Sequence, residues 1–78
     1  MLDQPLSALK DCNQAIKLAP DFADAYFIRA LAKLRSNKVM SAVDDANRSA
    51  NLFKTEGNLD RYQDCLNLIK DISLSYSD

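Results

Sequence analysis

Apolar residues recur along this chain at the three- and four-residue spacing that places side chains on one face of an α-helix. In the first such stretch, the apolar face consists of Leu6, Leu9, Cys12, Ile16 and Ala19. The same spacing is found in four stretches, at residues 5–19, 23–36, 40–53 and 59–75. The pattern therefore predicts an all-α chain of about four helices.

Turn-forming residues separate the four stretches. Pro20 ends the first helix, because its ring cannot continue the hydrogen-bond ladder. Asn37 is the residue expected to adopt a left-handed conformation after the second helix, and Gly57 marks the turn before the fourth. Turns this short join antiparallel neighbours, so residues 1–78 are predicted to form a single domain.

Composition narrows the class of protein. The 78 residues are 47% hydrophobic and 27% charged, with a formal net charge of -1, which suits a folded protein and argues against nucleic-acid binding. No apolar run approaches the roughly 18 residues needed to span a bilayer, so membrane insertion is not expected. Cys12 and Cys65 lie far apart without CxxC spacing, which indicates buried, reduced thiols and a cytoplasmic location.

The sequence contains few residues that could form a catalytic, metal or phosphate-binding site. The sequence contains no histidine, which excludes Ser/His/Asp and Cys/His nucleophile systems and most zinc sites. The aspartates lack the alternating spacing of a calcium loop, and Gly57 alone cannot form a Gly-rich phosphate loop. We therefore expect no enzyme activity, no metal and no cofactor.

An internal repeat appears when the chain is shifted on itself by 34 residues. Residues 7–18 then overlie residues 41–52, with five of twelve positions identical: Ser7/Ser41, Ala8/Ala42, Asp11/Asp45, Asn13/Asn47 and Leu18/Leu52. The pairs Cys12/Ala46 and Ala15/Ser49 keep small side chains. A period of about 34 residues is the length of one helix-turn-helix repeat unit.

Residues 15–30, AIKLAPDFADAYFIRA, resemble the junction between consecutive units of tetratricopeptide repeat (TPR) proteins. In that frame Pro20 closes one unit, Tyr26 opens the next, and Ala30 and Ala42 are small residues at a helix crossing. Ala46 departs from the pattern, because a large aromatic is usual there. The resemblance implies antiparallel helical hairpins stacked as a short right-handed solenoid. Its parts would be the second helix of a partial repeat (5–19), one complete repeat (23–54) and a C-terminal capping helix (59–75).

The resemblance also implies a function, namely a non-enzymatic scaffold that binds a partner's peptide or helix in the concave groove. The expected groove residues lie on the helix at 23–36: Asp24, Phe27, Ile28, Leu31, Leu34 and Arg35. Phe27, Leu31 and Leu34 would form its apolar stripe. In the alternative interpretation, the first or last helix covers part of this stripe as ordinary core.

Four cations follow one another without an intervening acid: Arg29, Lys33, Arg35 and Lys38. One interpretation is that Arg29, Lys33 and Lys38 contact an acidic partner segment through charge-assisted hydrogen bonds. The alternative is that these cations pair with a neighbouring helix through Asp44 or Asp45.

A second function from a different class is self-association. The resemblance leaves the helix at 5–19 without the helix that should precede it. Its apolar face, with Leu6, Leu9, Cys12 and Ile16, would then be uncovered and could form a homodimer.

Overall fold

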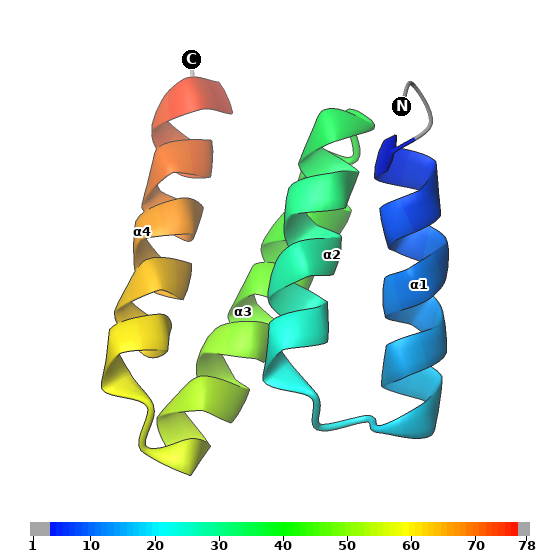
Figure 1. Cartoon of the computed structure of the whole chain (residues 1–78). Coiled ribbons are helices and arrows are strands. Elements are labelled where there is room, and N and C mark those ends of the chain that lie inside the picture. Colours follow the sequence, from blue (N-terminus) through cyan, green and yellow to red (C-terminus); the bar gives the residue numbers. More distant parts are fainter. Residues whose placement is uncertain (1–3, 77–78) are drawn as a thin grey trace.

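Four α-helices make up the part of the chain that the computed structural model describes, which is residues 4–76, with side chains described from residue 7 to residue 75. The helices are α1 (Gln4–Leu18), α2 (Ala23–Arg35), α3 (Val39–Glu56) and α4 (Leu59–Tyr76). These residues contain no strand. Consecutive helices are antiparallel: α1 packs against α2, α2 against α3, and α3 against α4 (Figure 1). The all-α prediction is confirmed.

The helix ends follow the turn residues that the sequence predicts, with one difference. The first, second and fourth helices begin and end within a residue or so of the expected positions. The third continues to Glu56, three residues beyond the expected end at Phe53. The 34-residue shift places Lys54 where the first copy has Pro20, and a lysine, unlike a proline, can continue a helix.

Two of the turns are closed by residues with a left-handed backbone. Asn37 has a φ of 65° and Gly57 a φ of 79°. After α2, the amide of Lys38 donates to the carbonyl of Lys33 at 2.8 Å. After α3, the amide of Asn58 donates to the carbonyl of Phe53 at 2.9 Å. Both are Schellman motifs, which satisfy carbonyls at a helix end, and the prediction for Asn37 is confirmed.

Small residues determine how closely α2 and α3 approach. Ala30 of α2 and Ala42 and Ala46 of α3 are completely buried against one another. Larger side chains surround this contact: Leu34, Leu68 and Ile69. Alanines at a crossing allow neighbouring helices to interdigitate at short distance.

A second cluster connects α2 and α3 with the start of α4. It contains Ala23, Ala50, Phe53 and Cys65, with Phe27, Leu52 and Tyr62 packed around it. The Ser49 hydroxyl is buried beside this cluster and donates to the Ala23 carbonyl at 2.9 Å. The Cys65 thiol donates in turn to the Ser49 hydroxyl at 3.4 Å. These bonds satisfy polar groups that would otherwise be costly to bury.

The four helices form a slab of 36 × 35 × 18 Å. Its thickness corresponds to about two helix diameters. The slab is therefore two helices deep at most, and much of each outer helix lies at the surface. Within residues 4–76, no helix is both long enough and apolar enough to cross a lipid bilayer.

Candidate functional site

The helix α2 lies between α1 and α4 (Figure 1). The predicted groove residues all lie on α2. The structure divides the four apolar residues among them between two environments. Phe27 and Leu34 are half-buried. Phe27 packs against the cluster that includes Cys65 of α4, and Leu34 packs, as Leu68 of α4 does, against the alanines of the α2–α3 crossing. Leu31 is 38% exposed and Ile28 is 47% exposed. The apolar stripe is thus partly core, and Leu31 is its exposed part. Together with Ile28, Leu31 forms an exposed apolar ridge.

A hollow of about 230 Å³ lies between α2 and α4. It is lined by Leu34, Leu68, Asp71, Ile72 and Ser75. Three of these side chains are aliphatic, and the carboxylate of Asp71 is exposed at the same place. The hollow is therefore suited to an apolar side chain with a cation beside it.

The other end of the α2–α4 contact is polar. Arg61 of α4 forms an ion pair with Asp24 at 3.0 Å. The same guanidinium lies 5.4 Å from the ring centres of Phe27 and of Phe53. Because both charged side chains of the pair are more than a third exposed, the pair contributes little stability, and the stacking of Arg61 covers the aromatic core. Asp24 thus holds a side chain of α4.

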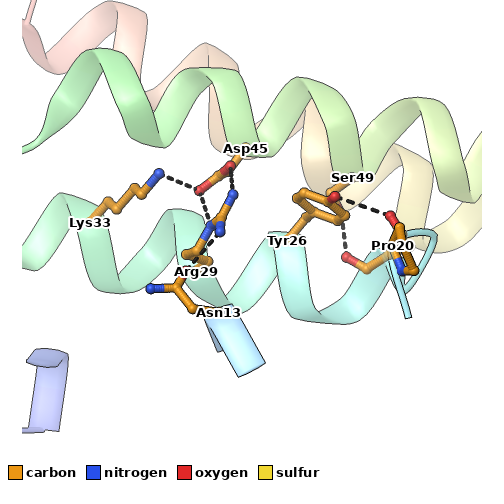
Figure 2. Close-up of polar contacts among 8 residues, drawn as sticks. Asn13, Pro20, Tyr26, Arg29, Lys33, Asp45 and Ser49 are labelled. Carbon is orange, nitrogen blue, oxygen red and sulfur yellow. Dashed lines mark hydrogen bonds and ion pairs between the residues drawn. The ribbon is translucent and has the colours of Figure 1, made fainter. Parts of the chain in front are cut away.

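The cations that precede the α2–α3 turn have two different surroundings. Arg29 binds Asp45 of α3 with two hydrogen bonds of 2.8 Å, from Nε to Oδ2 and from Nη2 to Oδ1 (Figure 2). Lys33 Nζ lies 2.9 Å from the same Oδ2. Arg35 and Lys38 are exposed. The structure therefore shows the alternative interpretation, pairing with Asp45, for Arg29 and Lys33.

Asp45 is a carboxylate at the contact between α2 and α3, with only 5% of its surface exposed. Burial alone would raise the pKa of its carboxyl group. The hydrogen bonds and positive charges of Arg29 and Lys33 outweigh this effect, so the pKa of Asp45 is lowered from its ordinary value. Arg29 also donates from Nη1 to the Asn13 side chain of α1 at 2.8 Å (Figure 2). One guanidinium thus connects three helices.

A second hollow, of about 290 Å³, lies between α1 and α2. Its lining comprises Ala8, Asp11, Cys12 and Ala15 of α1 and Phe22, Ala25 and Ile28 of the chain leading into and along α2. Phe22 and Ile28 are about half exposed, at 45% and 47%. Ile28 thus lies beside this hollow, whereas Leu34 lines the one beside α4.

The residues predicted for self-association do not form one open face. Cys12 is buried, and Leu9 and Ile16 are half-buried. Leu6 lies in α1, but its side chain is outside the described part of the structure. Cys12 is therefore a buried thiol, as is Cys65, and it cannot act as an exposed contact. Burial raises the pKa of both thiols, which disfavours the reactive thiolate.

Sequence reasoning missed two features of this surface. It did not identify Arg61 as a contact of Phe27, because the two residues lie in different predicted helices. It also missed the α1–α2 hollow, although the repeat Ala8/Ala42 and Asp11/Asp45 contained a signal for it. In residues 7–75, no three Cys, Asp or Glu side chains lie together in the way a metal ion would require.

Comparisons of the chain with protein-family models, with curated proteins and with solved structures gave no significant match.

Proposed function

We propose that this chain is a TPR-like, non-enzymatic interaction module that binds a peptide or helix of a partner protein along α2. One observation carries the proposal: the ridge of Ile28 and Leu31 is exposed on a helix that is otherwise well packed. Exposed apolar side chains beside a hollow are typical of surfaces that bind other proteins.

Several features support a repeat module. The 34-residue period relates the first half of the chain to the second, and consecutive helices form antiparallel hairpins. The small residues Ala30 and Ala42 are buried together where α2 crosses α3. Tyr26 is buried, and its hydroxyl donates to the carbonyl of Pro20 at 3.0 Å (Figure 2). This bond fixes the turn between α1 and α2, which in the proposal is the junction between two units of a right-handed solenoid.

The α2–α4 hollow defines the chemistry of the ligand. Its volume of about 230 Å³ admits one or two apolar side chains of the size of Leu or Phe. Asp71 at the same place favours a cation next to this apolar anchor.

The test compares partner capture by two double variants. In Leu31→Glu/Asp71→Arg, both changed residues are exposed and belong to the proposed site, so the fold is retained. Leu18→Glu/Met40→Glu is the matched control, since Leu18 and Met40 are exposed apolar residues elsewhere, on α1 and α3. Bound proteins are identified by mass spectrometry, and circular dichroism checks the helical content of each variant.

We expect the first variant to lose partners that the wild type and the control both retain. Partners that are lost equally from both variants would indicate general stickiness of apolar residues. An unchanged partner set for Leu31→Glu/Asp71→Arg, with the fold intact, contradicts the proposed binding site.

A further inference from the structure

The contact between α2 and α3 defines a small chemical pattern. Four residues of α3 lie under α2 and are buried: Ala42, Asp45, Ala46 and Ser49. Ala30 of α2 packs on the two alanines, and Arg29 and Lys33 bind the aspartate. The serine hydroxyl donates to the Ala23 carbonyl. The covering helix therefore presents a small residue next to two cations that share one carboxylate.

The same pattern occurs in α1, shifted by 34 residues. The counterparts of the four covered residues are Ala8, Asp11, Cys12 and Ala15. They keep the order small, acidic, small, small. These four are also the α1 residues that line the hollow between α1 and α2. A sequence repeat and a surface feature thus identify the same four positions independently.

On α1, three of the four residues are at least partly exposed, and Cys12 is buried. Asp11 is exposed, whereas its counterpart Asp45 is buried between two cations, and Asp11 makes no ion pair within residues 7–75. Ala8 and Ala15 are half-buried, whereas Ala42 and Ser49 are completely buried. The surface therefore has the chemistry of a face that receives a helix, and among the described helices none covers Asp11.

We propose that the α1–α2 hollow binds an amphipathic helix of a partner protein that carries the pattern Arg-Ala-x-x-Lys. The bound helix lies on α1 as α2 lies on α3. Its small residue packs over Ala8, and its Arg and Lys bind the carboxylate of Asp11. Phe22 and Ile28 form the opposite wall and contact the apolar side of the helix. This hollow shares Ile28 with the ridge on which the proposed function rests, but it contains neither Leu31 nor Asp71. A test at Asp11 therefore bears on this site alone.

A second copy of this chain is disfavoured as the occupant. The segment of the chain that carries the pattern is Arg29–Lys33, RALAK, in the middle of α2. Its small residue is already buried against α3, and both of its cations already bind Asp45. A second copy could present this face only by separating its own α2 from α3.

The test uses the whole chain and a labelled peptide of residues 22–37, which contains the α2 face in a separate molecule. Binding is followed by fluorescence anisotropy, and NMR identifies the methyl groups that are perturbed. We expect saturable binding, with shifts at Ala8, Ala15 and Ile28. Replacing Asp11 by Lys should weaken binding about tenfold, the typical effect of losing a close charge pair at an interface. The matched control, Asp44→Lys, changes another exposed aspartate outside the hollow and should leave the affinity unchanged.

Exchanging the charges of the peptide and of residue 11 tests whether the two contact each other directly. A peptide in which the residues corresponding to Arg29 and Lys33 are both Glu should bind the wild type weakly and should regain affinity for the Asp11→Lys chain. A peptide that merely displaced the chain's own α2 from α3 would bind both chains equally, and that result would overturn the proposal. Absence of binding at millimolar peptide would also overturn it.

Sedimentation of the chain alone tests whether a second copy of the chain, instead of a partner helix, occupies the α1–α2 hollow. We expect a monomer at all concentrations up to about millimolar, the range in which weak dimers appear. A dimer that dissociates on Asp11→Lys would show that a second copy fills the hollow, and would overturn the assignment to a partner helix.

Discussion

At the scale of single residues, Asp45 controls how the contact between α2 and α3 responds to pH. Its carboxylate is almost completely buried and accepts hydrogen bonds from Arg29 and Lys33. Burial acts to raise its pKa, but the two cations lower it below the ordinary value. A carboxyl group with a lowered pKa in the folded state stabilises the fold above its unfolded pKa of about 3.9. This stabilisation is lost as the pH falls through the folded pKa.

The variant Asp45→Asn should therefore be less stable than the wild type at neutral pH. We expect a loss of about 1–3 kcal/mol in the free energy of unfolding, between the values for an exposed and for a buried ion pair. The difference from the wild type should shrink as the pH is lowered below about 4, because the wild-type carboxylate then becomes protonated as well. Urea denaturation at a series of pH values measures both effects.

Asp44→Asn is the control for this experiment, because Asp44 is the neighbouring residue and is exposed. Its unfolding free energy should follow that of the wild type at every pH. An Asp45→Asn variant that is equally destabilised at pH 7 and pH 2 would show that shape, not charge, makes Asp45 necessary.

At the scale of the helices, α2 and α3 end in the same backbone conformation, although the residues that adopt it differ. Asn37 and Gly57 both adopt a left-handed backbone, in which a Cβ atom is strained and glycine is not. Asn37→Gly should thus stabilise the protein by about 0.5 kcal/mol, and Gly57→Ala should destabilise it by about 1 kcal/mol. A Cβ atom at Gly57 meets no atom within 4 Å, so the cost arises from the backbone alone.

Thermal and urea unfolding measure both changes. Asn51→Gly is the matched control, because Asn51 is exposed in the middle of α3, where glycine is unfavourable by about 0.5 kcal/mol relative to asparagine. The same substitution should therefore have opposite signs at positions 37 and 51. Equal signs would contradict the role of Asn37 as a helix-ending residue.

These helices could be predicted because their signals are local. Apolar spacing, Pro20, Asn37 and Gly57 each act within one turn of the chain, so the bounds of most helices follow from them. The groove could be predicted only in part. Phe27, Leu31 and Leu34 share one face of a helix, but the position of α4 decides that Phe27 and Leu34 are covered and Leu31 is exposed. That position depends on packing between helices distant in sequence, which spacing within α2 does not contain.

At the scale of the whole molecule, the helices differ in how many neighbours hold them. α2 and α3 lie in the middle of the slab, whereas α1 packs essentially against α2 alone (Figure 1). The open α1–α2 hollow leaves Ala8 and Ala15 only half covered. Local opening of a segment requires less free energy when it breaks fewer buried contacts. α1 should therefore open more readily than the rest of the described structure.

Hydrogen exchange followed by mass spectrometry tests this expectation on the whole chain. Amides in the second half of α1 should exchange at least about tenfold faster than those of α2 and α3, since such rates report the free energy of local opening. Equal protection of α1 and α3 would contradict the prediction. Adding the peptide of residues 22–37 should slow exchange in α1, because a helix in the hollow supplies the contacts that α1 lacks, and α4 serves as the control. Slowing confined to α4 would place the peptide in the hollow between α2 and α4 instead, and α1 would remain the least protected helix.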